Sequence, residues 1–269
     1  MNTSMIKGLL RKFLGDTVTA NLHGVRFYLL SRSKPHHEPE MDLAPLVLAE
    51  GDVAVDVGAL AGDWSEKLAL AVGKSGRVFA FEADQYYAKA TRAAIRLMGL
   101  SNVTLFSHGL SDQEEDLELI VRDENGVLLY GDQKAVKAGE GLPNQTVPIH
   151  LLPLDTVAEK QPDLFRAKLI KCDVEGMEAQ VFRGAAKVIA QARPLLVWEA
   201  EAPAEVLALL KTLAYKSYYH VEEKRHWREL APGAGETDGP GLFPAGFQPT
   251  SPNILSAPAE KEFSFLAKA

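Results

Sequence analysis

Short apolar runs alternate with helix-like segments between about residues 51 and 200, and this alternation constrains the fold more than any other feature. The runs are unbroken rather than interrupted at every second residue, which is typical of strands buried on both faces. Parallel strands covered by crossing helices are buried in this way. We therefore predict an α/β fold with a doubly wound, mostly parallel sheet. Its strands are expected at 53–57, 77–81, 103–106, 168–172 and 194–198, and its helices at about 64–72, 86–98, 176–190 and 203–213.

The segments outside this alternation are expected to surround the sheet. Residues 1–50 are predicted to form a small N-terminal cap, made of a helix, a short hairpin around 18–30 and a polar loop with His36 and His37. Residues 51–269 are expected to form one domain. Within it, 112–155 is interpreted as an insertion with strand-like segments at 117–122 and 146–152. The glycine- and proline-rich stretch 231–252 is predicted to be a long loop, and a last strand is expected after it, at 253–257.

Composition excludes several functional classes. The chain carries 29 basic and 36 acidic residues, a net charge of −7, which argues against a protein that binds nucleic acid by neutralising phosphates. Its single cysteine, Cys172, rules out an internal disulfide framework and fits a reducing, cytoplasmic compartment. No apolar run approaches the roughly 20 residues that span a bilayer. The first residues lack the pattern of a cleaved signal, so we expect them to belong to the mature protein.

Four predicted strands end in a carboxylate. Asp56, Glu82, Asp173 and Glu199 each stand at or directly after the end of an apolar run. In an open α/β sheet the ligand lies beyond the carboxyl ends of the strands, where the strand order reverses. One such acid often only caps the next helix. Four on one edge indicate a site for a cationic ligand, a metal ion or a bound proton.

The turn after the first strand indicates which cofactor fits. Dinucleotide folds place Gly-x-Gly-x-x-Gly here so that a pyrophosphate can approach the helix N-terminus. This chain instead has Asp56-Val-Gly58-Ala-Leu-Ala-Gly62-Asp63, with two glycines four residues apart and an acid on each side. Those acids would repel a pyrophosphate but suit S-adenosylmethionine (SAM), which is cationic and has no phosphate. Glu82 is placed to accept hydrogen bonds from its ribose hydroxyls.

A series of motifs runs through the same region: Val55-Asp-Val-Gly-Ala-Leu-Ala-Gly62, Val78-Phe-Ala-Phe-Glu82, Leu110-Ser-Asp112, Leu154-Asp155, Ile170-Lys-Cys-Asp-Val-Glu-Gly-Met-Glu178, Gly184 and Pro194-Leu-Leu-Val-Trp-Glu199. This series resembles the FkbM family of SAM-dependent methyltransferases. The resemblance implies a Rossmann-like sheet of seven strands whose last strand is antiparallel. It also implies O-methylation of a hydroxyl on a sugar or secondary metabolite. The chain departs from the family pattern at Leu60, where Asn is usual, and at Gly109, where Ala is common.

The candidate site residues follow from the strand ends and from the resemblance. Asp173 and Glu175 are the first candidates for the base that takes the acceptor's proton, and with Glu199 they offer oxygen ligands for a divalent cation. Whether the chain uses such a metal is left open. The residues expected to bind the cofactor are Asp56, Gly58, Ala59, Gly62, Ser65, Glu82, Ser111, Asp112 and Asp173.

Other side chains are given structural interpretations. Glu178 is expected to support its helix or to pair with Arg183, and Cys172 to fill the core. His220 and His226 are candidates for a general base that reaches the substrate, but a solvent-facing or hydrogen-bonded role is the commoner one for histidine.

Three functions remain open on this evidence. The first is a SAM-dependent O-methyltransferase acting on a small hydroxylated acceptor, with no nucleic-acid partner. The second is a nucleotide-dependent oxidoreductase on the same architecture, which the missing third glycine disfavours. The third is a relative that binds SAM without catalysis, which the departure at Leu60 suggests. The sequence identifies neither the acceptor nor the oligomeric state.

Overall fold

A computed structural model covers the chain. It describes every residue except 1–2, 35, 124, 126, 128, 130, 132, 141–144, 201–202, 222–225, 231–250, 264 and 267–269. For residues 3–13, 221 and 226 it describes the backbone alone. Most of the predicted loop 231–252 therefore lies outside the described residues.

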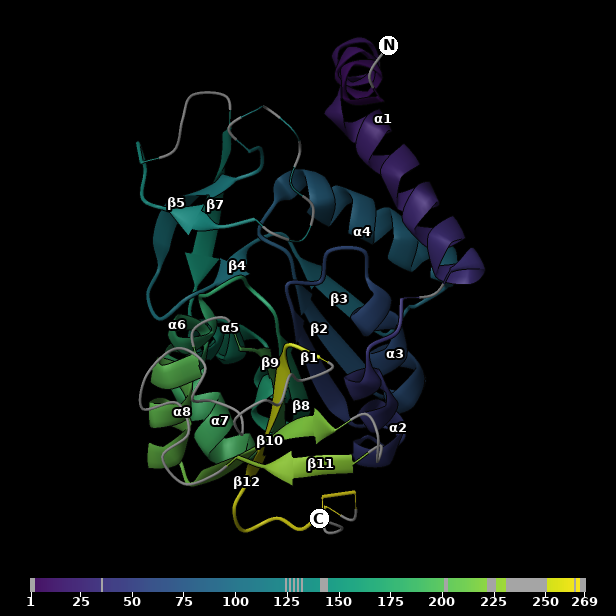
Figure 1. The fold of residues 1–269 in the computed structure, drawn as a ribbon. Coiled ribbons are helices and arrows are strands. Elements are labelled where there is room, and N and C mark those ends of the chain that lie inside the picture. Colours follow the sequence, from purple (N-terminus) through teal and green to yellow (C-terminus); the bar gives the residue numbers. More distant parts are fainter. Residues whose placement is uncertain are drawn as a thin grey trace.

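The core is a sheet of eight strands in the order β11-β10-β12-β9-β8-β1-β2-β3 (Figure 1). The five strands from β9 to β3 are parallel, as predicted from their unbroken apolar runs. The strand order reverses between β1 and β8, which makes their carboxyl ends the switch point of the sheet. The strands are β1 (Val53–Val57), β2 (Arg77–Phe81), β3 (Val103–Phe106), β8 (Ala167–Cys172), β9 (Leu195–Glu199), β10 (Tyr215–Val221), β11 (His226–Glu229) and β12 (Asn253–Pro258).

The other edge of the sheet is antiparallel. The last strand, β12, runs between β9 and β10 and is antiparallel to both, as the family resemblance implies. The expected number of seven strands is one too low within the described residues, because β11 pairs with β10 and adds a short outer strand. The expectation of a Rossmann-like, mostly parallel sheet is otherwise confirmed.

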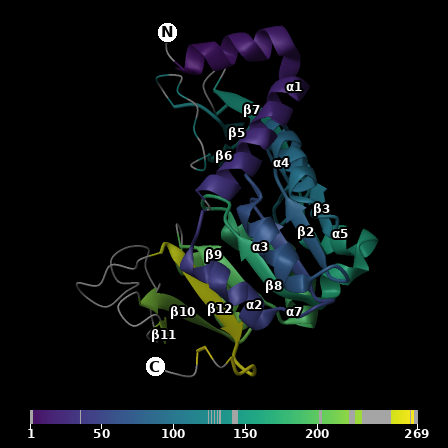
Figure 2. The ribbon, with the colours of Figure 1, turned by 90° about the vertical axis from the view of Figure 1, so that its right-hand side faces the viewer.

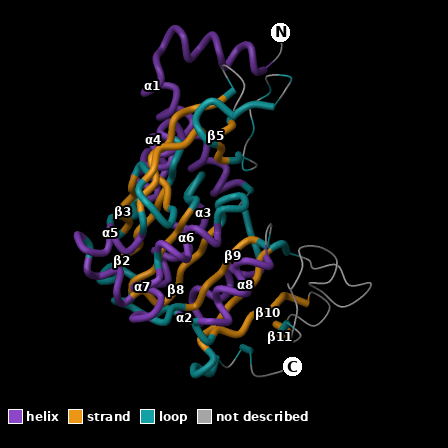
Figure 3. Tube along the Cα trace, turned by 90° about the vertical axis from the view of Figure 1, so that its left-hand side faces the viewer, coloured by secondary structure: helices purple, strands orange, loops and turns teal. Residues whose placement is uncertain are grey.

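Helices cover both faces of the sheet (Figure 3). The side chains of α2 (Ala44–Val47) and α3 (Asp63–Val72) pack on one face, and those of α5 to α8 pack on the other. The single helix predicted at 176–190 is instead two, α6 (Glu178–Gly184) and α7 (Ala186–Ala192), because Ala185 leaves the helical conformation at φ −107° and ψ 14°. The remaining elements are η1 (Pro39–Leu43), α4 (Gln85–Met98), α5 (Leu154–Lys160), η2 (Pro162–Arg166) and α8 (Pro203–Thr212).

The hairpin predicted at 18–30 is wrong. The chain there belongs to one long helix, α1 (Thr3–Ser33), which bends at Gly15 and then runs along α4 (Figure 2). Gly24, which favours a turn in the sequence, instead allows a close approach between helices. A Cβ added to it would lie 2.3 Å from the carbonyl oxygen of Ala90 on α4.

The insertion forms a second sheet beside the first. Its four strands are β4 (Gly109–Leu110), β7 (Thr146–Leu152), β5 (Glu115–Ile120) and β6 (Ala135–Val136), in that order across the sheet. The predicted segments at 117–122 and 146–152 correspond to β5 and β7, which pair antiparallel. Buried Leu119, Ile149 and Leu151 hold this sheet together on one side.

No helix within the described ranges is both long enough and apolar enough to cross a membrane.

Candidate functional site

The glycine turn after β1 forms because its backbone passes close to β8. Gly58 has φ +79°, and a Cβ at this position would lie 2.0 Å from the carbonyl oxygen of Asp173. Only glycine fits both the conformation and the space. The N–H groups of Gly58 and Ala59 both donate to the carbonyl oxygen of Phe81, at 3.0 Å each. The turn is thereby tied to the ends of β2 and β8, and Gly62, at φ +87°, leads it into α3.

Leu60 lies at the top of this turn in an unusual conformation for a residue with a side chain, at φ 35°. Two hydrogen bonds hold it there. Its N–H donates to Glu82 Oε2 at 2.9 Å, and its carbonyl oxygen accepts from the hydroxyl of Thr91. The family departure at Leu60 therefore leaves the backbone of the turn fixed to its neighbours.

Glu82 follows β2 and lines the same cavity as the turn. Its Oε1 accepts from the N–H of Asp84 at 2.9 Å, so each carboxylate oxygen already holds one backbone donor. A carboxylate oxygen accepts more than one hydrogen bond, so both keep capacity for a ligand hydroxyl. Burial raises the pKa of Glu82 to about 7, despite the hydrogen bonds from Asp84 and Leu60.

Asp56 and Ser65 lie beneath the cavity rather than in its wall. Both are fully buried, and the Ser65 hydroxyl donates to Asp56 Oδ2 at 2.6 Å. Burial raises the pKa of Asp56 above its usual value. Both were expected to bind the cofactor, but neither lines the cavity, and their hydrogen bond instead joins β1 to α3.

Lys171, a cavity residue that the sequence analysis did not single out, connects these groups. Its Nζ lies 3.3 Å from Asp173 Oδ2, 3.7 Å from Asp56 Oδ1 and 3.0 Å from the carbonyl oxygen of Gly58. Burial alone would lower the pKa of Lys171, but the carboxylates of Asp173 and Asp56 outweigh it and raise the pKa. A lysine in a central parallel strand is the signal that could have found it, because such a charge is buried only with partners.

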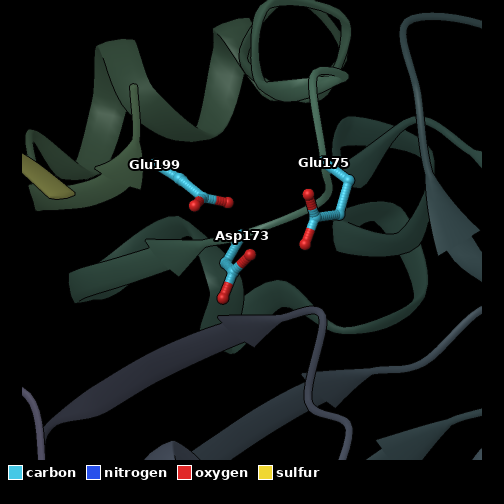
Figure 4. Close-up of side chains that lie close together, drawn as sticks. All are labelled: Asp173, Glu175 and Glu199. Carbon is cyan, nitrogen blue, oxygen red and sulfur yellow. The ribbon is translucent and has the colours of Figure 1, made fainter. Parts of the chain in front are cut away.

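Asp173, Glu175 and Glu199 come together at the carboxyl ends of β8 and β9 (Figure 4). One carboxylate oxygen from each lies within 4.8 Å of the others. Burial, followed by the charges of Asp173 and Glu175, raises the pKa of Glu199 to about 8. The cluster therefore favours a shared proton or a divalent cation, and its all-oxygen composition is that of a site for a hard cation.

Asp173 and Glu175 line a cavity of about 400 Å³, within the usual range for a small-molecule site, whereas Glu199 does not line it. The glycine turn, Glu82 and Lys171 also line the cavity. Leu30 of α1, the following Lys34, and Leu119 and Leu151 of the insertion sheet contribute to the same lining.

Ser111 and Asp112, also expected to bind the cofactor, are engaged elsewhere and do not line the cavity. The Ser111 hydroxyl donates to Glu115 at 2.7 Å, and Asp112 pairs with Arg183 at 3.0 Å. Glu178 does not bind Arg183. It accepts hydrogen bonds from the backbone N–H groups of Val174 and Gly176, which hold the turn before α6.

Glu38 links three distant segments at the rim of the cavity. It accepts hydrogen bonds from the indole N–H of Trp64 and from the amide of Asn253, at 3.0 Å each, and its other oxygen lies 2.8 Å from His36 Nε2. His36 lines the cavity, whereas His37 lies 3.5 Å from Asp42. This network joins the segment before β1 to α3 and to β12.

Among the described residues, the remaining sequence candidates do not line the cavity. His220 is buried against Trp227, with ring centroids 5.3 Å apart. The side chain of His226 lies outside the described residues. Cys172 is fully buried, and burial raises the pKa of its thiol well above the usual value, which fits the expected core role.

A protein-family model described as the methyltransferase FkbM domain matches residues 56–218 of the chain. No curated protein matches. Among solved structures, a methyltransferase FkbM from Methylobacillus flagellatus is 17% identical, with a TM-score of 0.45, over 82% of this chain and 59% of the other. This chain therefore spans little more than half the length of that protein.

Two other solved structures are similar at the same level. A SAM-dependent O-methyltransferase from Thermotoga maritima is 15% identical, with a TM-score of 0.41, over 88% of this chain and 72% of the other. A putative rRNA methylase from Clostridium thermocellum is 16% identical, with a TM-score of 0.43, over 81% of this chain and 90% of the other.

Proposed function

The chain belongs to the FkbM methyltransferase domain family, and from this premise we propose that it transfers the methyl group of SAM to a hydroxyl of a small acceptor. The observation that carries the proposal is Glu82, a buried carboxylate in the wall of the cavity beside the glycine turn. A ribose diol would donate two hydrogen bonds to such a group.

The charge of the cavity supports a cofactor without phosphate. Asp63, Glu82, Asp173 and Glu175 line it, and Lys171 is already paired with two carboxylates. A pyrophosphate would be repelled by this arrangement, whereas a sulfonium and an ammonium group would be attracted. This argues against the alternative of a nucleotide-dependent oxidoreductase. We propose that Glu82 binds the ribose and that Gly58, Ala59 and Gly62 shape the turn beside it.

When bound, SAM supplies a methyl group on a positively charged sulfur. The residues of the chain must then orient the acceptor and receive its proton. We propose that Glu199, whose pKa lies near 8, takes the proton of the acceptor hydroxyl as the new C–O bond forms and the C–S bond breaks. Asp173, held by Lys171, would share the proton that Glu199 receives, and Glu175 would complete the cluster.

The same three carboxylates fit a divalent cation, because three oxygen ligands within 4.8 Å of one another suit magnesium or calcium. Asp173, Glu175 and Glu199 would hold it, and its charge would lower the pKa of an acceptor hydroxyl. Removal of metal with EDTA distinguishes the two forms of the mechanism. Loss of turnover that Mg²⁺ restores would support the cation, and unchanged turnover would support the carboxylate base.

Calorimetry with SAM and its demethylated product tests the cofactor assignment. We expect both to bind the full chain. We expect Glu82→Ala to weaken the binding of SAM by about 2 kcal/mol, because two hydrogen bonds to a charged group are lost. Glu50→Ala is the matched control, because Glu50 binds Ser75 in the loop before β2. Absence of SAM binding, or tight binding of NADH instead, would contradict the proposal.

Turnover is tested separately, by transfer of labelled methyl from SAM to a panel of hydroxylated small molecules, with RNA as a further candidate. We expect transfer to a small molecule and none to RNA, since the chain carries a net charge of −7. SAM binding with no transfer to any acceptor would favour the non-catalytic alternative.

A further inference from the structure

One face of α1 exposes a row of large apolar side chains. Val18, Leu22, Val25 and Leu29 are each 40% exposed or more, and their spacing of four, three and four residues places them along one side of the helix after its bend at Gly15. We call these four residues the α1 stripe. Contiguous apolar surface of this kind marks an interaction site more often than isolated exposed residues do.

The stripe stands on a helix that is fixed by its opposite face. Ala20, Gly24 and Phe27 are buried, and Ala20 and Phe27 pack with alanines of α4. At the end of the helix, Arg32 forms an ion pair of 2.5 Å with Glu66 on α3. The stripe is therefore not a surface that α1 buries by folding back onto the described part of the protein.

Charge indicates what covers the stripe. Residues 1–34 contain six basic residues and one acidic residue, a net charge of +5, whereas residues 35–269 contain 23 basic and 35 acidic residues, a net charge of −12. Stripe-to-stripe pairing of two copies would bring two segments of +5 together, and like charges oppose such pairing. An anionic lipid surface complements both the charge and the apolar row.

We propose that α1 lies on the surface of an anionic bilayer, with the stripe in the boundary between headgroups and acyl chains. The helix does not cross the membrane, in agreement with its composition. The acidic remainder of the protein points away from the lipid, because α1 lies at one end of the molecule (Figure 1). The C-terminal end of the same helix borders the cavity through Leu30 and Ser31, so the bound surface and the site share one element.

Co-sedimentation of the full chain with lipid vesicles tests this. We expect binding to vesicles of phosphatidylcholine with about 30% phosphatidylglycerol, little binding to pure phosphatidylcholine, and weaker binding as salt is raised. The double variant Leu22→Glu/Leu29→Glu should lower the partition coefficient by about tenfold or more, because it places two charges in the apolar row.

The matched control is Leu46→Glu/Leu70→Glu, which changes two leucines of similar exposure, 63% and 68%, on α2 and α3. We expect it to bind vesicles like the unchanged chain, and circular dichroism verifies that both variants fold. Failure of the unchanged chain to bind anionic vesicles would overturn the proposal, as would equal binding by the stripe variant. Light scattering that shows a dimer, broken only by the stripe variant, would overturn it in favour of a second copy.

Discussion

The carboxylate of Glu82 accepts a hydrogen bond of 2.9 Å from the backbone N–H of Leu60, and this bond joins the end of β2 to the turn after β1. A second backbone donor, Asp84, holds the other oxygen. The carboxylate is therefore oriented by the fold before any ligand arrives, which reduces the entropy that binding would cost.

The raised pKa of Glu82 predicts that SAM affinity depends on pH. The pKa of Glu82 is about 7, so at lower pH its carboxyl is protonated in the free protein. It must lose this proton to accept two hydrogen bonds from the ribose. The affinity for SAM should therefore increase as pH rises from 6 towards 7 and level off above about 8. Calorimetry across this range measures the effect. Glu82→Gln should bind weakly with a flatter profile, and an equally steep profile in that variant would assign the titration to another group.

Lys171 is expected to be essential for the stability of the central strands. Lys171→Met leaves Asp56 buried without its cation, and we expect a loss of about 3 kcal/mol in the free energy of unfolding by urea. The double variant Lys171→Met/Asp56→Asn removes both charges and should recover part of that loss. If the double variant loses as much unfolding free energy as the single variants Lys171→Met and Asp56→Asn lose together, the two side chains are not coupled.

Glu199 is expected to govern the pH dependence of turnover if it is the base. Its pKa of about 8 means that the ionised form increases as pH rises through 8, so kcat/KM should rise over that range and then level off. Glu199→Gln should lower kcat by about 100-fold or more and remove that limb of the profile. Glu205→Gln, a change at an exposed acid on α8, provides the comparison. A Glu199→Gln enzyme with an unchanged profile would exclude Glu199 as the base.

Gly24 is expected to control how closely α1 approaches α4. In Gly24→Val the new Cβ would lie 2.3 Å from the carbonyl oxygen of Ala90, so α1 must move outward. We expect a loss of about 1 to 3 kcal/mol and faster hydrogen exchange in α1. Val25→Ala, one residue away on the exposed face, should leave exchange in α1 unchanged. Slow exchange in Gly24→Val would mean that the helix pair tolerates the added side chain.

The parallel strands and the acid cluster were predictable because their information is local. An unbroken apolar run identifies a buried strand, and the acid that follows it must lie at the carboxyl edge, so the sequence alone predicts that Asp173, Glu175 and Glu199 lie together. The engagement of Asp112 by Arg183 was not predictable, because the two residues are 71 positions apart and only the packing of α6 beside β4 brings them together.

The N-terminal cap and Lys171 could not be predicted from sequence for a different reason. The interval from Val18 to Leu30 contains β-branched residues and a glycine, which together favour a hairpin, but the small residues at 20 and 24 serve contact with α4 instead. Here packing against α4, a helix more than 60 residues later in the chain, outweighs the local preference for a hairpin. Likewise, one partner of Lys171 is Asp56, which belongs to β1, so spacing along the chain does not connect these two residues.

The position of β12 has a consequence for how the protein is made. Residues Asn253–Pro258 separate β9 from β10, so these two strands never pair with each other. While the ribosome is still translating the segment before residue 253, β9 presents an open, apolar edge to other nascent chains. We expect polypeptides released before this point to aggregate, and completion of the sheet to wait until residues 253–258 have left the ribosomal tunnel.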